Sequence, residues 1–367
     1  MSIEPVLSVF LENICHNYHL LKETYPDTDI AGVLKNEAYG LGAAPIAQTL
    51  YAHESCHTFF VAYPSEGAQI RPFIPDATLY VLQGFDADNA DLYIQNRLIP
   101  VTNTIETLRA ADAAGLPLAI QLETGLNRLG ISITEAQNLD IATRTKVSLI
   151  LSHLASADEM SNPQNKDQLE NFKQFFSLFP NAKKTLAASD GAALGKNFTF
   201  DIIRAGAFLY GIKTFPQLAD RQKKAVELTA ALLQIKPLHT GDKVGYNATF
   251  TASQDMKMGV VSIGYGDGLL RSLSNKGRVF VKQGNVLYPA PIIGRVSMDN
   301  IMCDLTQIPD AVLEKTKHVY LLTDEYNVDE MGKDADTIGY EVLSALGRGQ
   351  RTIKNYIGFH PTTKPTL

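Results

Sequence analysis

One lysine, Lys35, stands where an apolar run meets a loop that contains glycine. The run covers residues 30–35, and residues 36–42 that follow include two glycines. A short apolar run that ends at glycine predicts a buried strand with the lysine at its end. A partly neutral amine in such a place can act as a base or form a Schiff base with a carbonyl cofactor. Position alone, however, favours a solvated lysine that ends a strand.

Short apolar runs recur through the first part of the chain. We predict strands at residues 30–35, 58–63, 77–83, 117–124, 147–155 and 184–189. Amphipathic segments lie between them, for example residues 162–179, whose apolar positions have helical spacing. This alternation predicts a parallel sheet covered by helices, and its many repeats favour a closed (β/α)8 barrel of the TIM type. Catalytic residues of such a barrel lie at strand ends, as we expect for Lys35.

The pattern changes near residue 225. Segments rich in β-formers and separated by glycine cover residues 225–235, 258–266, 277–284, 286–294 and 318–324, and helical spacing returns at 337–346. We therefore predict an α/β chain in which a barrel over residues 1–228 is followed by a mainly antiparallel β domain over residues 229–367.

Composition excludes several classes of function. The formal net charge is −6, which argues against a nucleic-acid partner. The three cysteines are scattered without a CxxC pair, so we expect no metal site and a reducing compartment. The N-terminus has no secretory signal pattern, and no apolar stretch approaches the ~20 residues that span a bilayer. We expect a cytoplasmic enzyme without a membrane partner.

Several segments resemble one enzyme family. Residues 33–42 (VLKNEAYGLG) resemble the cofactor-lysine segment of the alanine racemases, in which an alanine–tyrosine–glycine run follows the lysine. Further matches follow in family order at residues 123–130, 151–155, 188–190, 204–211, 244–250, 263–268, 294–299 and 338–342. Chance could explain one of these matches but not the whole ordered set.

The resemblance implies an eight-stranded barrel, a β domain and pyridoxal 5′-phosphate as cofactor. It also implies interconversion of L- and D-alanine, which supplies D-alanine for cell-wall peptidoglycan. Racemisation removes a proton from one face of Cα and returns one to the other, so it suggests two bases on opposite faces. The cofactor makes the Cα–H acidic enough to be removed. The resemblance assigns the two bases to Lys35 and Tyr246.

The resemblance also assigns binding roles. Arg204 stays protonated beside the cofactor ring nitrogen, and a hydrogen-bond chain leads from Arg204 through His153 to Tyr246. Met298 offers its backbone N–H to the substrate carboxylate. The cofactor-binding set is Lys35, Tyr39, Arg128, His153, Ser189, Arg204, Gly206, Ala207 and Tyr340. The substrate-binding set is Arg128, Tyr265, Met298 and Asp299.

The same resemblance implies a homodimer with shared active sites, in which each β domain covers the partner's barrel. Lys35, His153 and Arg204 would then come from one chain, and Tyr246, Tyr265 and Met298 from the other. The sequence alone leaves an arrangement within one chain open.

Two positions depart from the family pattern. Gln121 stands where the family often has a carbamylated lysine that holds the arginine, so Arg128 must be held by Glu123, by Gln121 or by a bound anion such as chloride. Ala188 stands where an asparagine is common. Neither departure removes Lys35 or Tyr246.

The sequence leaves alternative functions open. A serine or broad-specificity racemase of the same fold is the nearest alternative, since broad-specificity relatives also lack the carbamylated lysine. The absence of an export signal and the bulk of Tyr340 favour alanine. A decarboxylase of similar architecture is disfavoured by the Gly–Tyr–Asn–Ala–Thr run at residues 245–249. A cofactor-binding barrel without catalysis would lack the β domain.

Overall fold

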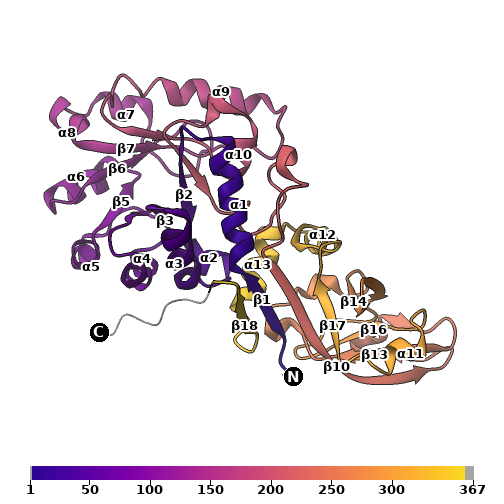
Figure 1. The fold of residues 1–367 in the computed structure, drawn as a ribbon. Coiled ribbons are helices and arrows are strands. Elements are labelled where there is room, and N and C mark those ends of the chain that lie inside the picture. Colours follow the sequence, from indigo (N-terminus) through magenta and orange to yellow (C-terminus); the bar gives the residue numbers. More distant parts are fainter. Residues whose placement is uncertain (1, 360–367) are drawn as a thin grey trace. The chain divides into compact units, whose positions relative to one another are not determined.

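A computed structural model describes residues 2–359 (Figure 1). The chain forms two compact units. The first, here the barrel unit, contains Ile14–Ala38 and Gly42–Lys223. The second, here the β unit, contains residues 2–13, the short segment Tyr39–Leu41 and residues 224–359. The division after residue 228 that the sequence predicts stays a prediction.

The barrel unit contains, within the described residues, an eight-stranded parallel sheet. Its strands are β2 (Asp29–Val33), β3 (Thr58–Val61), β4 (Thr78–Val81), β5 (Leu98–Thr102), β6 (Leu118–Gln121), β7 (Val147–Leu151), β8 (Lys183–Thr185) and β9 (Ile202–Ala205). They follow the order β8-β7-β6-β5-β4-β3-β2-β9. A parallel bridge between Ala188 and Arg204 links the two ends of this order. The predicted barrel is confirmed, as a nearly closed one.

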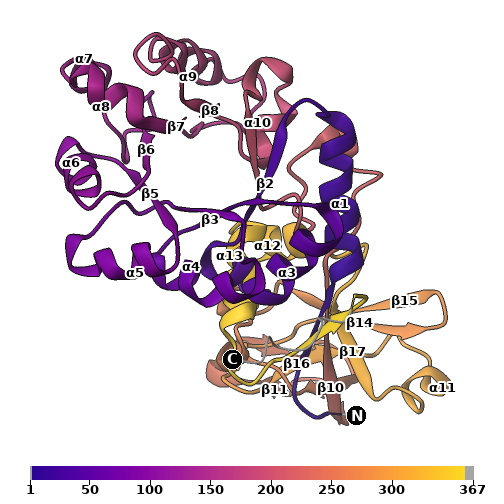
Figure 2. The same cartoon turned by 60° about the vertical axis from the view of Figure 1, so that its left-hand side comes forward.

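Helices cover the outside of these strands (Figure 2). They are α3 (Ala43–Glu54), α4 (Pro64–Ile70), α5 (Ala90–Gln95), α6 (Ile105–Ala113), α7 (Ile133–Gln137), α8 (Ile141–Lys146), α9 (Pro163–Lys173) and α10 (Ser189–Ala193). Strands β3 and β6 are buried at every position, as expected for strands between helices and barrel interior. Side chains of Thr104, Ser132, Asp140 and Asn162 cap the first turns of α6 to α9.

The β unit is built around one long strand, β10 (Val226–Leu238), which pairs antiparallel with β1 (Val6–Phe10), β13 (Met256–Val261) and β17 (His318–Leu322). The remaining strands are β14 (Arg278–Gln283), β15 (Val286–Pro291), β16 (Ile301–Asp304), β18 (Ile353–Ile357) and the short pair β11 (Lys243–Val244) and β12 (Phe250–Thr251). Only β1 and β18 pair in parallel among the described strands of this unit. The predicted mainly antiparallel domain is confirmed.

Three helices complete the β unit within the described residues: α11 (Asp310–Leu313), α12 (Val328–Asp334) and α13 (Gly339–Arg348). Helix α13 corresponds to the helical pattern expected at residues 337–346. Helix α1 (Leu11–Thr24) begins at the end of β1. No helix in residues 2–359 has both the length and the apolar character needed to cross a membrane.

Candidate active site

Lys35 lies two residues beyond the end of β2, at the start of a left-handed turn labelled α2 (Lys35–Tyr39). The φ angles of Asn36, Glu37, Ala38 and Tyr39 are 53°, 55°, 51° and 60°. A left-handed conformation costs a residue with a side chain roughly 1–2 kcal/mol, so four in succession require strong support from their surroundings. Strain of this kind concentrates at functional sites.

The carboxylate of Glu66 supplies part of that support. Its Oε1 accepts a hydrogen bond of 2.6 Å from the N–H of Asn36, the first left-handed residue. Its Oε2 accepts from the N–H groups of Ala62 at 2.6 Å and Tyr63 at 3.2 Å. Glu66 therefore ties the turn after Lys35 to the end of β3 and the start of α4.

Sequence reasoning did not single out Glu66. The signal was present, because Pro64 begins α4 and a glutamate in the third helical position commonly closes a capping box. Nothing in that local pattern reveals that the other carboxylate oxygen reaches the turn after Lys35.

The surroundings of Lys35 lower the pKa of its amine. Burial is the largest cause, followed by the positive charges of Arg128 and Arg204, while the Glu66 carboxylate opposes the shift. Each of the first three disfavours the ammonium form. Lys35 is thus more easily neutral than an exposed lysine, as a nucleophile or a base requires.

Arg204 is buried on strand β9 and donates to acceptors from two neighbouring segments, the ends of β7 and β8. Its Nη1 donates to the carbonyl oxygen and to Oγ1 of Thr185, at 3.1 and 2.8 Å. Its Nη2 donates to the carbonyl oxygen of Ser152 at 2.7 Å and to Nδ1 of His153 at 3.3 Å. Burial lowers the pKa of Arg204 to about 10, so it remains a cation at neutral pH.

His153 follows β7 and is held neutral. Burial and then the charges of Arg204, Arg128 and Lys35 lower its pKa to about 3. A guanidinium has only donors, so Nδ1 of His153 must accept, and the ring hydrogen lies on Nε2. The structure places Lys35, Arg128 and Arg204 close enough to His153 for their charges to act on it, and Arg128 and Arg204 act on Lys35 in the same way.

Ser189 begins α10 and contacts the loop after β9. Its Oγ accepts hydrogen bonds of 3.2 Å from the backbone N–H groups of Gly206 and Phe208. Because two amides already donate to this oxygen, the hydroxyl hydrogen is directed away from them. Ala207 is buried between these two residues. Ser189, Gly206 and Ala207 therefore form one polar corner beside Arg204, whose strand bridges to Ala188.

The loop that carries Arg128 is braced by the two side chains that we considered as holders for it. The amide Nε2 of Gln121 donates to the carbonyl oxygen of Leu129 at 3.0 Å. The carboxylate of Glu123 accepts from the N–H of Gly125. Arg128 forms no hydrogen bond or ion pair with the residues that the structure describes. Gln121 and Glu123 thus shape the loop backbone and do not bind the guanidinium.

The remaining predicted residues lie in the β unit. Tyr39 and Tyr340 pack together, with ring centroids 5.8 Å apart. Tyr246, Met298 and Tyr265 have large side chains that are 68%, 53% and 43% exposed. Large apolar side chains that are this exposed often mark a surface that another molecule covers.

Two family models together account for most of the chain. Residues 9–214 match the N-terminal domain of alanine racemase, and residues 225–354 match its C-terminal domain. This chain belongs to the alanine racemase family. The interval between the two matched ranges includes the division between the barrel and β units after Lys223.

Relatives that match over nearly their whole length are named alanine racemase. The chain is 35% identical to the alanine racemase of Brucella ovis over 96% of this chain and 94% of that protein. It is 36% identical to the alanine racemase of Rickettsia canadensis over 94% of this chain and 97% of that protein. The crystal structure of the Bartonella henselae alanine racemase, which has covalently bound pyridoxal phosphate, matches with a TM-score of 0.87 at 31% identity, over 97% of this chain and 100% of that one.

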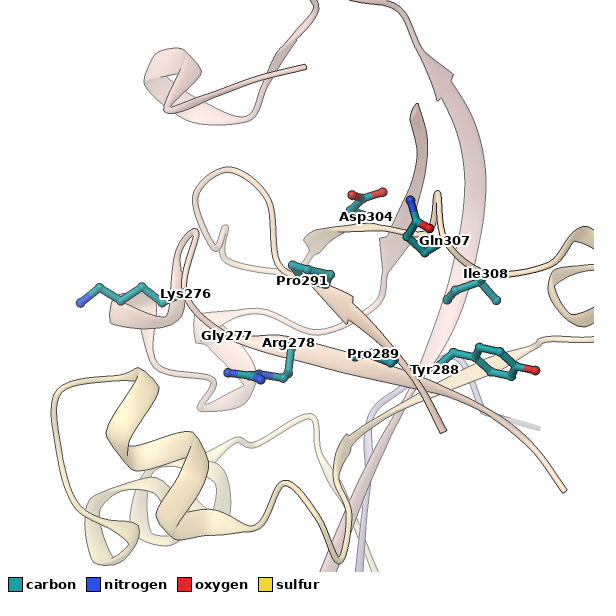
Figure 3. A pocket seen from close by; sticks show the side chains of 9 residues that line it. All are labelled: Lys276, Gly277, Arg278, Tyr288, Pro289, Pro291, Asp304, Gln307 and Ile308. Carbon is teal, nitrogen blue, oxygen red and sulfur yellow. The ribbon is translucent and has the colours of Figure 1, made fainter. Parts of the chain in front are cut away.

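A separate cavity of about 700 Å³ lies in the β unit of this racemase-family chain (Figure 3). Its lining includes Lys276, Arg278 and Asp304, and none of the site residues expected from sequence. Lys276 pairs with Asp336, and Arg278 pairs with Asp334 at 3.1 Å. These carboxylates neutralise the two cations, so the cavity lacks the uncompensated positive charge found around Lys35.

Proposed function

We propose that this chain is an alanine racemase that interconverts L- and D-alanine with pyridoxal 5′-phosphate and so supplies D-alanine for peptidoglycan. The observation that carries the proposal is the cluster at the carboxyl ends of the barrel strands. There burial and the charges of Arg128 and Arg204 lower the pKa of Lys35, and burial together with the Arg204 charge keeps His153 neutral. Membership of the family along the whole chain supports the same activity.

The residues of the barrel unit fit this cofactor. Three cations, Lys35, Arg128 and Arg204, face only a smaller opposing charge from Glu66, so the cluster favours an anionic ligand. The Ser189 hydroxyl hydrogen, which points away from the Gly206 and Phe208 amides, and the N–H of Ala207 are suited to a phosphate. The full set that we assign to the cofactor is Lys35, Tyr39, Arg128, His153, Ser189, Arg204, Gly206, Ala207 and Tyr340. When bound, pyridoxal phosphate supplies the electron sink that makes Cα–H acidic.

Two side chains would move the proton. The Lys35 amine, neutral more often than an exposed lysine, takes or returns a proton on one face of Cα. We assign the phenol hydroxyl of Tyr246 to the opposite face. His153 presents its Nε2–H on the side away from Arg204, and we assign this hydrogen to a bond with the Tyr246 oxygen. Arg128, Tyr265, Met298 and Asp299 are assigned to the substrate.

A homodimer with shared sites is part of the proposal. Tyr246, Tyr265 and Met298 are too exposed to exclude water from a reacting centre by themselves. In a second copy placed head to tail, each β unit would lie over the partner's barrel unit. Two-fold symmetry would then cover these side chains in both active sites. We also propose that the enzyme is cytoplasmic, in keeping with the buried free thiols of Cys56 and Cys303.

Racemisation of purified protein tests the function. Incubation with pyridoxal phosphate and L-alanine should produce D-alanine, and D-alanine should be converted back. L-serine should react more slowly, because the ring of Tyr340 leaves little room for a hydroxymethyl group. Loss of alanine racemisation in protein that has bound the cofactor would contradict the proposal. Equal rates with serine would favour the broad-specificity alternative.

A further inference from the structure

We infer that Arg351 is a positioning residue that sets the substrate side of the site, by holding the backbone around Met298 against the turn that carries Tyr265. The inference rests on the proposed function, in which Met298 and Tyr265 face the substrate. Arg351 lies after helix α13, and sequence reasoning did not single it out. All the contacts below lie within the β unit.

Arg351 contacts both segments at once. Its Nε pairs with Oδ1 of Asp267 at 2.9 Å, and its Nη1 pairs with Oδ1 of Asp299 at 2.5 Å. Its Nη2 donates to the carbonyl oxygen of Met298 at 3.3 Å. One planar guanidinium therefore connects the 3-10 turn Tyr265–Asp267 with the Met298–Asp299 segment. A lysine has no fork of fixed donors and could not make the three contacts together.

The backbone of Met298 is fixed on both sides. The N–H of Tyr265 donates to the carbonyl oxygen of Ser297 at 3.0 Å, and the N–H of Gly266 donates to the carbonyl oxygen of Met298 at 2.9 Å. In a trans peptide the N–H points opposite to the preceding carbonyl. Because the Ser297 carbonyl faces the turn, the N–H of Met298 points away from it. This amide is the one assigned to the substrate carboxylate.

The turn that carries Tyr265 and the segment that carries Met298 are also closely packed. A Cβ atom on Gly264 would overlap the carbonyl oxygens of both Ser297 and Met298. One on Gly266 would overlap Nη2 of Arg351. A small shift of either segment therefore moves the other, and the guanidinium is the side chain that joins them.

The contact with Asp267 explains why Arg351 fixes the position of the turn that carries Tyr265 and does more than balance charge. The carboxylate of Asp267 is buried, and besides Arg351 it accepts a 2.9 Å hydrogen bond from the N–H of Gly264. Removal of Arg351 leaves this buried carboxylate without its cation, so the turn must move toward water. That movement would carry the Met298 amide out of line with the substrate carboxylate.

The expected consequence is a change in binding more than in chemistry. An amide that contacts the carboxylate equally in ground and transition states contributes to KM and leaves kcat nearly unchanged. Lys35 and Tyr246 do not contact Arg351 in the described structure, so proton transfer should persist. We expect Arg351→Ala to raise KM for alanine by about tenfold or more, with kcat within about threefold.

The experiment uses purified enzyme loaded with pyridoxal phosphate. KM and kcat are measured in both directions for the wild type, Arg351→Ala and Arg351→Lys. Calorimetric titration with propionate, a carboxylate of the same size as alanine without its amine, gives a second readout that needs no turnover. Both KM and the propionate Kd should rise in Arg351→Ala, with Arg351→Lys intermediate.

Arg278→Ala is the matched control. Arg278 lies in the same unit, its side chain is likewise 46% exposed, and it pairs with the carboxylate of Asp334. This control should keep the wild-type KM. If Arg351→Ala does not fold, Asp267→Asn, which weakens another arm of the same bridge at a residue not assigned to the substrate, should raise KM and the propionate Kd by a smaller factor.

The possible results distinguish a failure of the proposed racemase function from a failure of the role assigned to Arg351. Wild-type protein that does not racemise alanine would contradict the proposed function. Wild-type protein that racemises alanine, together with variants at Arg351 or Asp267 that keep KM and the propionate Kd unchanged, would overturn the role of Arg351 alone. A fall confined to kcat would also overturn it.

Discussion

Arg204 donates a hydrogen bond of 3.3 Å from Nη2 to Nδ1 of His153, and this bond determines the tautomer of the histidine ring. Since guanidinium nitrogen atoms only donate, His153 accepts through Nδ1 and has its hydrogen on Nε2. Protonation of Nδ1 would place a second positive charge against Arg204 in a buried place. The pair therefore keeps one charge, on the arginine.

This pair predicts a loss of stability in acid. The pKa of His153 is lowered to about 3 in the folded chain, whereas an unfolded histidine titrates near ~6.5. Between these values the unfolded chain binds the extra proton, so the free energy of unfolding falls as the pH falls from about 6.5 toward 3. One such group contributes a slope of up to about 1.4 kcal/mol per pH unit.

Denaturant unfolding at pH 7, 6, 5 and 4 measures that slope. His153→Gln, which cannot titrate, should show a shallower decline than the wild type over this range. His19→Gln is a suitable control, because His19 is mostly exposed and pairs with Glu23 at the surface. Parallel curves for the wild type and His153→Gln would contradict the assignment of a buried neutral histidine.

Lys35→Ala should abolish racemisation in both directions, because one proton-transfer group and the covalent attachment point are lost together. We expect kcat to fall by at least ~10²–10⁴-fold, the usual contribution of a general base. The absorbance of bound pyridoxal phosphate should also lose its sensitivity to borohydride. Full activity of this variant would show that another lysine serves the reaction.

Tyr246→Phe should impair the two directions unequally. If the phenol serves one face of Cα, its loss blocks proton exchange on that face more than on the other. Solvent deuterium incorporation is followed separately from L-alanine and from D-alanine. The same loss of exchange from both enantiomers would argue against a base that serves one face.

Glu66→Gln should loosen the left-handed turn after Lys35. A hydrogen bond to a charged group contributes about 1.5–3 kcal/mol, and three backbone amides share this carboxylate. We expect lower stability and at least a tenfold lower kcat. Glu135→Gln is the control, since Glu135 occupies the same third position of a capping box in α7 but serves only its own helix. An equal loss in both variants would leave Glu66 with a merely structural role.

Much of the architecture could be predicted from periodicity. The apolar runs that became β3, β4, β6 and β7 stand out because both faces of a barrel strand are buried. Two strands of the barrel were missed for reasons visible in their residues. Strand β5 contains Pro100, which weakens a strand pattern, and β9 contains the charged Arg204.

Long-range pairing could not be read from the sequence. Strand β1 has no feature that indicates antiparallel pairing with β10 and parallel pairing with β18, more than 200 residues away. The left-handed turn was equally hidden, because Asn36, Glu37 and Ala38 have no glycine among them and adopt positive φ only in this setting. The barrel site residues lie at strand ends and loops, where motif spacing is informative. The contact of Glu66 with the amide of Asn36 and the pairing of Arg351 with Asp267 and Asp299 join segments far apart in sequence, and no motif records them.

Complementation is the most direct test of the central claim, that Lys35 of one chain and Tyr246 of another form one active site. Inactive Lys35→Ala chains are mixed with inactive Tyr246→Ala chains under conditions of subunit exchange, and exchange is confirmed independently. A shared site predicts that mixed dimers contain one intact site and regain measurable alanine racemisation. Activity that stays at the level of the separate variants after confirmed exchange would place both groups in one chain and contradict the account.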